Sequence, residues 1–371
     1  NQQLEIKGVV LNAFTTKQET IFYCVGFNRD LELMLQALQQ LTAALNVTPQ
    51  QLANEKAVIY NEILANDNWS EHFDHVCHSV FDSHPLANKV AGTKSGIESL
   101  SLEALHNLHN TYYRPDNISI IVSGYVEQQR VLAALHQTPA DSAAVTPTYT
   151  TKTLFTPGLA LHKNRKYKQA FCSLCFNVAM SSRRDYYCYQ LISLLLSGGF
   201  SSPLYQKMRI ENAFSYEFST VFDAGTCHGD DVYQYHFLGF HFATAKQDLA
   251  NALTILTTAL CQLSLAIDSR DLERAKNSLL LELERARQDA KEMAHFYQTS
   301  YQLFHEVKPI DDDIDCVQRI SRQEIEACLR AMLCGDINIT VTGRAKKLDY
   351  LALVTAQLQD FTAENECIPF P

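Results

Sequence analysis

The same order of predicted elements occurs on either side of a central linker. Residues 117–124 and 336–343 are each a short apolar segment that ends in glycine, and both predict buried strands followed by helices. Predicted strands and then amphipathic helices lie ahead of both segments. Residues 138–152 between the halves are small and polar, with two prolines and no apolar period, which is typical of a linker. This order predicts an internal duplication and an α+β fold of two similar halves, each an antiparallel-rich sheet packed with helices.

The length of 371 residues exceeds one ordinary core, so we expect domains at 1–140 and 153–371, joined by residues 141–152. A hydrophobic content of 46% is that of a globular protein, and the net charge of −10 argues against nucleic acid or an anionic membrane as the main partner. Eleven scattered cysteines are unlike a small disulfide scaffold, so a reducing, cytoplasmic location is expected. No apolar run approaches the ~18 residues of a membrane span.

Hydrophobic periodicity and helix-start signals place the other elements of both halves. In the first half we expect two strands within residues 5–25, a helix capped by Asp30, a helix that begins at Thr48-Pro49, and helices near 70–81, 102–113 and 126–137. In the second half we expect strands near 154–178, a helix over 186–196 that ends at Gly198-Gly199, strands near 214–243, and then long helices.

The predicted helix after Thr48-Pro49 carries Glu55 and Glu62, which are seven residues apart. Two helical turns take about 7.2 residues, so these carboxylates share one face about 10 Å apart. A buried carboxylate is costly unless it is paired, hydrogen-bonded or bound to a metal. The alternative is a solvated surface helix with scattered acids. Four apolar neighbours predict that at least Glu62 is partly buried: Val58, Ile59, Ile63 and Leu64.

Four segments occur in the order that is familiar from one peptidase family. They are residues 12–15, residues 54–62, residues 197–209 with Phe214-Ser215-Tyr216, and residues 271–276. In this order they resemble the pitrilysin, or insulinase and mitochondrial processing peptidase, family of inverted zinc metallopeptidases, and the resemblance extends over nearly the whole chain. Residues 12–15 are similar to the family's edge strand beside the zinc, and residues 54–62 to the helix with the third zinc ligand. Residues 197–209 are similar to its glycine-rich segment, and residues 271–276 to a common helix start.

This resemblance implies a zinc endopeptidase whose two halves face each other across a cavity and clamp a peptide. Glu62 would be a zinc ligand, and Glu55 would support catalysis by orienting a histidine ligand. The segment Asn12, Ala13 and Phe14 would pair with substrate backbone as an added strand. Two further residues, Arg209 and Tyr216, would bind substrate carbonyls or stabilise the oxyanion. In isolation, Arg209 could equally be a surface cation and Tyr216 a half-buried strand residue.

One family motif is missing, because no His-x-x-Glu-His occurs in residues 1–371. A catalytic zinc needs three protein ligands, so Glu62 alone cannot hold it. We therefore expect the motif upstream of Asn1. Without it, the protein would be a non-catalytic partner or scaffold that contributes Arg209 and Tyr216 to another chain's zinc site. Either form is expected to act as a homodimer or as a heterodimer with a related subunit.

Two other groups of metal-binding residue types occur in the sequence. His72, His75 and His78 lie three residues apart on a predicted helix, where we expect exposed or half-buried side chains and no metal site. Cys172 and Cys175 lack a second pair, and strand alternation predicts that they point to opposite faces. The sequence therefore argues against a zinc ribbon or a thioredoxin-like site.

Overall fold

The computed structural model describes residues 2–43, 45–65, 67–135, 155–215, 218–228 and 232–364, so the predicted linker 141–152 and Tyr216 lie outside it. The chain divides into two compact units that alternate along the sequence. Unit 1 comprises Asn1–Asp67, Asn88–Thr148 and Gln288–Gln298, and unit 2 comprises Asn68–Ala87, Tyr149–Arg287 and Thr299–Pro371. Both units combine strands with helices, so the α+β class is confirmed. The domains 1–140 and 153–371 stay a prediction.

Unit 1 is built around a β-hairpin of two strands, β1 (Val10–Thr15) and β2 (Thr20–Val25). The strands pair antiparallel from Val10↔Val25 to Thr15↔Thr20, as predicted. Residues 5 and 6 are not part of the first strand, because Gly8 adopts a φ of 70° and turns the chain out of a preceding helix. The helices wholly in this unit are α1 (Gln2–Ile6), α2 (Leu31–Thr42), α3 (Pro49–Ala65), α5 (Lys94–Ser99), α6 (Leu102–Tyr112) and α7 (Gln128–Ala134).

Two details of unit 1 differ from the prediction. Asp30 precedes α2 as expected, but its side chain makes no capping hydrogen bond and instead lies buried, 3.6 Å from Lys7 Nζ. The strand predicted over 117–124 is wrong, because residues 118–123 form no regular secondary structure. A strand needs a partner for its N–H and C=O groups, and in the described part of the chain β1 and β2 pair only with each other. The predicted correspondence of this segment with 336–343 therefore fails.

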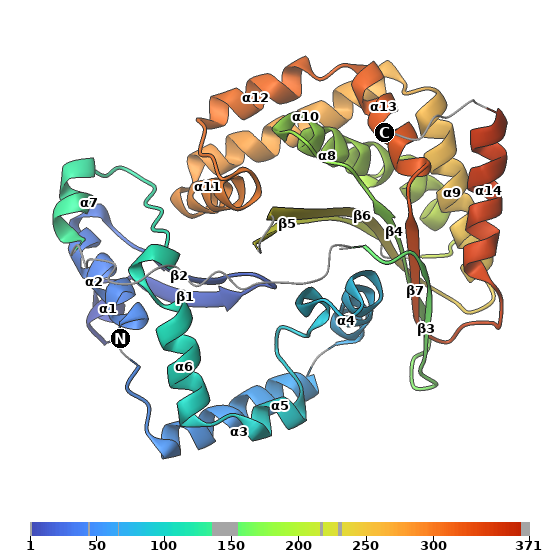
Figure 1. Cartoon of the computed structure of the whole chain (residues 1–371). Helices are drawn as coiled ribbons and strands as arrows, with labels where there is room; N and C mark the ends of the chain where they lie inside the picture. The colour runs from blue at the N-terminus through green and yellow to red at the C-terminus, as the bar shows by residue number, and fades with distance from the viewer. Residues whose placement is uncertain are drawn as a thin grey trace. The chain divides into compact units, whose positions relative to one another are not determined.

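Unit 2 contains a five-stranded sheet in the order β3-β7-β4-β6-β5 (Figure 1). The last strand in sequence, β7, lies between β3, to which it is parallel, and β4, to which it is antiparallel. The remaining pairs, β4 with β6 and β6 with β5, are antiparallel, as predicted for this half. The strand bounds are β3 Gly158–Lys163, β4 Ala170–Asn177, β5 Phe218–His228, β6 Val232–Thr244 and β7 Ile337–Gly343.

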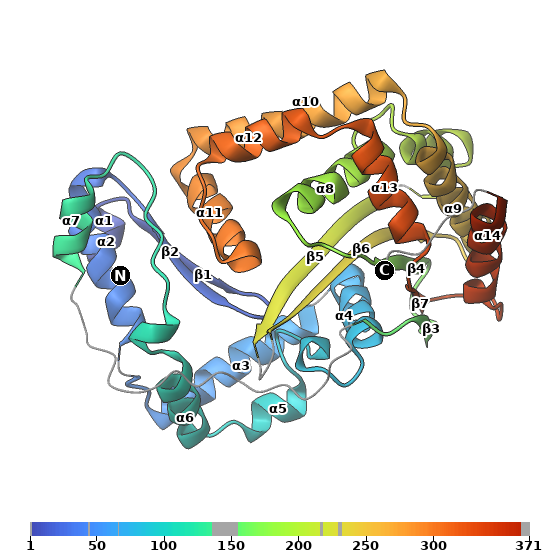
Figure 2. The same cartoon turned by 45° about the horizontal axis from the view of Figure 1, so that its top comes forward.

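The two faces of this sheet differ in polarity because successive side chains of a strand point to opposite sides. The apolar residues Ile339 and Val341 of β7 face four helices, which lie on the side away from α4 (Figure 2). These are α8 (Arg183–Ser197), α9 (Leu249–Leu265), α13 (Arg322–Leu333) and α14 (Tyr350–Glu364). The alternate residues Asn338, Thr340 and Thr342 are buried and polar, and they face the single helix α4 (Asn68–Phe81).

Three further helices complete the unit: α10 (Ser269–Gln288), α11 (Ala290–Phe304) and α12 (Ile310–Arg319). Residues 290–298 of α11 belong to unit 1 and residues 299–304 to unit 2. No single helix in the described ranges is long and apolar enough to cross a membrane. The pair α9 and α10 passes the same length and composition criteria only when taken together, across a bend of 103°.

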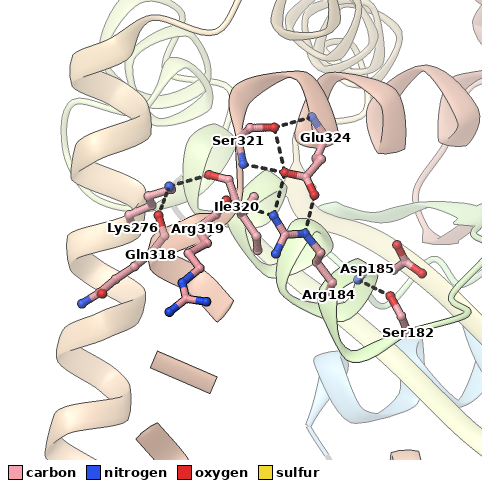
Figure 3. A network of polar contacts seen from close by, with 9 residues as sticks. All are labelled: Ser182, Arg184, Asp185, Lys276, Gln318, Arg319, Ile320, Ser321 and Glu324. Carbon is pink, nitrogen blue, oxygen red and sulfur yellow. Dashed lines mark hydrogen bonds and ion pairs between the residues drawn. The ribbon is translucent and has the colours of Figure 1, made fainter. Parts of the chain in front are cut away.

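The segment 271–276, singled out in the sequence, lies in α10 and supports its neighbours through two basic residues. Arg274 donates a hydrogen bond to the backbone oxygen of Gly198, which follows the last residue of α8, as predicted for the glycine break. Lys276 donates to the backbone oxygen of Ile320 at 2.5 Å, between α12 and α13. Beside it, Arg184 of α8 binds Glu324, which caps α13 (Figure 3). These contacts fix the ends of α8 and α13.

Candidate functional site

Both glutamates singled out in the sequence lie on α3 in unit 1, and both are exposed. The predicted burial of Glu62 is therefore wrong. The reason is the phase of the helix: residues 52, 56, 59, 60 and 63 form its half-buried stripe, whereas 55, 58 and 62 lie on the opposite side. Two of the apolar neighbours, Val58 (49% exposed) and Leu64 (66% exposed), lie outside that half-buried stripe. Glu55 and Glu62 thus present their carboxylates to solvent on one face.

The orientation of α3 is fixed by its contact with α5. Lys56 Nζ donates to the backbone oxygens of Glu98 at 3.0 Å and Leu100 at 2.6 Å, at the end of α5. The ammonium of Lys94 lies 4.9 Å from the centre of the Tyr60 ring, which is a cation–π contact. Because these residues belong to the half-buried stripe or to α5, they hold the glutamate-bearing face outward.

The described residues do not by themselves form a zinc site. No group of three or more His, Cys, Asp or Glu side chains that could hold a metal ion occurs among them. Glu62 offers one carboxylate, and a catalytic zinc requires three protein ligands. The donor set that the described residues supply is therefore incomplete.

Strand β1 has one edge without a partner strand in the part of the chain that the structure describes. Thr16 donates its backbone N–H to Glu19 O at 2.8 Å. Hydrogen-bonded and non-hydrogen-bonded residue pairs alternate along an antiparallel hairpin, so this bond fixes which residues of β1 are bonded to β2. It follows that Leu11, Ala13 and Thr15 direct their backbone groups away from β2. The outward N–H of Ala13 is bonded to the side-chain oxygen of the residue before it, Asn12 Oδ1, at 2.8 Å.

The side chains of β1 are mostly exposed. Phe14 is 42% exposed and packs edge-to-face with Tyr23, with ring centres 6.3 Å apart. Val10, which points to the same face as Phe14, is 55% exposed. The predicted segment Asn12, Ala13 and Phe14 therefore combines an unpaired backbone edge with uncovered apolar side chains, which suits it to accept an extended chain.

Arg209 lies in unit 2, on the π-helix η4 (Tyr205–Glu211), a rare conformation that recurs at functional sites. Its guanidinium lies 5.0 Å from the centre of the Tyr205 ring. After this helix the chain turns back through Ala213 at a φ of 51°, and Phe214 donates its N–H to Met208 O at 2.8 Å. The proposed partner of Arg209, Tyr216, lies outside the described residues.

The buried network around His72 was missed in the sequence. Its Nδ1 lies 2.8 Å from Thr342 Oγ1 of β7, and its Nε2 lies 2.7 Å from Ser173 Oγ of β4. Ser173 Oγ is in turn 2.5 Å from Nδ1 of His241 on β6. Since His72 is only 1% exposed, its predicted exposure is wrong, whereas His78 is exposed as expected. The network joins α4 to three strands of the sheet.

Burial lowers the pKa values of the two innermost histidines of this network, His72 and His241. Burial lowers the pKa of His72 well below 6.5, and the nearby His241 and His75 lower it further. Burial also lowers the pKa of His241 to about 4. The ring of His75, whose Nδ1 is 3.0 Å from Thr342 Oγ1, stacks on His162 with centres 3.9 Å apart. The sequence signal for this polar face is the alternation of residue types over 337–342. Asn338, Thr340 and Thr342 alternate there with the apolar residues Ile337, Ile339 and Val341.

The two cysteines of the Cys-x-x-Cys segment point to opposite faces of the sheet, as predicted. Cys175 packs with Cys77 of α4 in one core cluster. Cys172 lies close enough to Tyr350 of α14, a helix on the other face of the sheet, to raise the pKa of that tyrosine. Burial raises the pKa of both strand thiols, so they are inert parts of the core.

Two family models match the chain. Residues 1–94 match "Insulinase (Peptidase family M16)" and residues 99–279 match "Peptidase M16 inactive domain". An uncharacterized zinc protease of Mycobacterium leprae is 24% identical over 230 residues, 60% of this chain and 52% of the relative. The human mitochondrial cytochrome b-c1 complex subunit 1 is 26% identical over 133 residues, 35% of this chain and 28% of the relative. The alignments thus span about half, or less, of these relatives.

The fold is also that of solved peptidases. The crystal structure of a protease from Helicobacter pylori has a TM-score of 0.78 at 15% identity and covers 93% of this chain and 84% of the other. At this identity the likeness concerns the fold alone. The relatives thus include a zinc protease and a subunit of the mitochondrial cytochrome b-c1 complex.

Proposed function

Because the chain belongs to the insulinase-type peptidase family M16, we propose that it acts as a zinc-dependent metalloendopeptidase on peptides or unfolded segments. One observation carries this proposal: Glu55 and Glu62 stand exposed on one face of α3, within the segment matched by the insulinase model. These two solvated carboxylates, two helical turns apart, do not contribute to the packing of α3. Their spacing suits a metal ligand and a supporting carboxylate.

In this proposal Glu62 is a zinc ligand and Glu55 is a positioning residue that orients a histidine ligand. The remaining ligands must come from residues that the described segments do not include, which is a condition of the proposal. Zinc, when bound, would polarise the scissile carbonyl. Arg209 and Tyr216 would donate hydrogen bonds to substrate carbonyls or to the oxyanion.

The substrate would bind β1 as an added strand. Its carbonyl would replace Asn12 Oδ1 on the outward N–H of Ala13, so Asn12 holds that donor ready until a peptide arrives. Phe14 and Val10 would cover the apolar side chains of the peptide. In this binding mode the peptide is recognised mainly through its backbone hydrogen bonds and less through its side chains. This fits a preference for unfolded segments.

Metal content and peptide cleavage, measured on the full-length protein, test the metal assignment. Glu62→Gln should lose zinc and activity together, because a neutral amide is a poorer ligand. Glu55→Gln should keep most of the zinc and lower turnover by about 10- to 100-fold. Arg209→Ala should keep the zinc and reduce turnover. Glu103→Gln, an exposed carboxylate on α6, is the matched control and should change neither quantity. A Glu62→Gln protein with parental zinc and cleavage would refute the assignment.

The substrate strand is tested separately with Ala13→Pro. Proline removes the outward N–H but leaves the ladder to β2 intact, because that N–H does not point to β2. We expect weaker binding of an extended peptide with unchanged zinc content and unchanged circular dichroism. Ala13→Ser keeps the N–H and is the control. Equal peptide affinity in both variants would remove β1 from the proposal.

A non-catalytic subunit is the second candidate. It is favoured by the match of residues 99–279 to a model described as an inactive domain and by the similarity to a cytochrome b-c1 subunit. In that case the full-length protein would hold no zinc at Glu62, and a related zinc-bearing chain would cleave peptide faster in its presence. Loss of this stimulation in Arg209→Ala would identify the contribution to a shared site. For either candidate we propose a homodimer or heterodimer, and a cytoplasmic location.

A further inference from the structure

Helices α8 and α13 contact each other in a regular register. Arg184 of α8 binds Glu324 of α13, with Nη2 at 2.9 Å from Oε2 (Figure 3). Four residues further along both helices come Cys188 and Cys328, whose thiols are hydrogen-bonded to each other. Residues four apart lie on one face of a helix, so the ion pair and the thiol pair are neighbouring contacts in the same interface between α8 and α13.

The two thiols differ in access to solvent. Cys188 is 1% exposed, whereas Cys328 is only half-buried. The hydrogen bond from Cys188 lowers the pKa of Cys328, and the same contact together with burial raises the pKa of Cys188. Cys328 is therefore the thiol that an oxidant reaches, and it is also the one whose pKa the contact lowers, so it is the attacking thiol and Cys188 is the protected neighbour.

We propose that Cys188 and Cys328 form an intramolecular redox site that a hydroperoxide converts to a disulfide between α8 and α13. The Cys328 thiolate attacks the peroxide, so that an S–O bond forms, the O–O bond breaks, and an alcohol, or water from hydrogen peroxide, leaves with a proton. The sulfur of Cys188 then attacks the Cys328 sulfenic acid. An S–S bond forms and water leaves. Two thiols are oxidised and one hydroperoxide is reduced by two electrons.

The other cysteines near this region do not share these features. Cys77 and Cys175 also contact each other, but both are fully buried between α4 and the sheet, so an oxidant cannot reach either. Cys316 is half-buried and hydrogen-bonds to Arg184, and it is the rival partner for Cys328. A reducing compartment would return the disulfide to thiols, so the site would be a reversible sensor.

The test is mild oxidation of the full chain with hydrogen peroxide, followed by alkylation and peptide mapping by mass spectrometry. We expect one new disulfide that joins the peptides of Cys188 and Cys328, a loss of 2 Da, and full reversal by dithiothreitol. Cys188→Ser should accumulate a dimedone-reactive sulfenic acid at Cys328 and no disulfide. Cys328→Ser should leave Cys188 reduced. Cys316→Ser is the matched control and should form the disulfide at the parental rate.

Three results would overturn the proposal. They are a disulfide between Cys328 and Cys316, oxidation of Cys261 while Cys188 and Cys328 stay reduced, and a lack of sulfenic acid in Cys188→Ser. Should a serine variant fold poorly, circular dichroism will reveal it, and Cys188→Ala then repeats the trapping experiment. Because the disulfide is read on the parent chain, the first two of these results do not depend on any variant.

Discussion

Acid should weaken unit 2 steeply, because three of its histidines are buried in the neutral form. Burial lowers the pKa of His236 and His241 to about 4 and that of His72 well below 6.5. Between pH 6.5 and the lowered pKa, the unfolded chain binds protons at these residues and the folded chain does not. Stability is therefore complete above about pH 6.5 and is lost as the pH falls below it.

The size of the effect follows from the number of histidines. Each neutral buried imidazole removes about 1.4 kcal/mol of unfolding free energy for every pH unit below 6.5. His236 and His241, whose pKa values are lowered to about 4, together remove about 4 kcal/mol over the 1.5 units from pH 6.5 to 5, and His72 adds to this loss in the same direction. Because domains are typically stable by about 5–15 kcal/mol, this loss is a large share of the stability of unit 2 at pH 5.

The chain has a built-in probe for this experiment, since Trp69 is its single tryptophan and lies on α4. Its ring contacts Phe171 of β4 edge-on, with centres 4.8 Å apart. Urea unfolding monitored by Trp69 fluorescence at several pH values therefore reports on α4 and its sheet. We expect the unfolding free energy to fall by about 3 kcal/mol between pH 6 and pH 5 from His236 and His241, and further through His72.

Two variants on the same helix isolate the cause. His72→Gln should cost about 2–3 kcal/mol at pH 7, because two buried hydrogen bonds weaken, and should reduce the acid slope by about 1.4 kcal/mol per pH unit. His78→Gln changes an exposed histidine and should alter stability by less than about 0.5 kcal/mol. An unchanged slope in His72→Gln would show that His72 does not stay neutral on folding.

Three further changes test single contacts by urea unfolding. Arg183→Met removes the guanidinium from Asp313, whose side chain is 0% exposed, and should cost about 3–5 kcal/mol at pH 7; a cost under about 1 kcal/mol would contradict this. Glu324→Gln should cost only about 1 kcal/mol, because both partners are more than a third exposed. Arg184 lowers the pKa of Glu324 to about 2, so this cost should be full above pH 5 and vanish toward pH 2. Gly343→Ala should cost about 2–3 kcal/mol, since φ is 104° and the added Cβ would lie 2.6 Å from a backbone oxygen; parental stability would refute the strain.

Much of the fold was predicted from the sequence because its signals are local. The apolar period and the Thr48-Pro49 start placed α3, and strand alternation placed β4 and the opposed cysteines Cys172 and Cys175. Residues 118–123 show the limit of this approach. Their composition favours a strand, but whether a strand forms depends on a partner elsewhere in the chain, which composition does not reveal.

The candidate site was predicted less completely, for a related reason. The seven-residue spacing correctly put Glu55 and Glu62 on one face, but apolar neighbours in sequence did not decide which face of α3 is buried. That depends on Lys56 and its carbonyl partners at the end of α5, some 40 residues away. The His72 network depends on β7, which is farther still. Contacts between residues so far apart in the sequence leave little local pattern. For the His72 network, the one signal is the alternation of polar and apolar residues in β7, and it is weak.

The position of β7 has a consequence for synthesis on the ribosome. Thr342 follows its partner His72 by 270 residues, and β7 is the strand that lies between β3 and β4. At about 5–20 residues per second, α4 emerges roughly 15–50 s before that strand exists. Through this interval the sheet lacks the strand between β3 and β4, and Val76, Val80 and Phe81 have no finished surface to cover them. A nascent-chain chaperone that recognises apolar helices would find its binding site in α4.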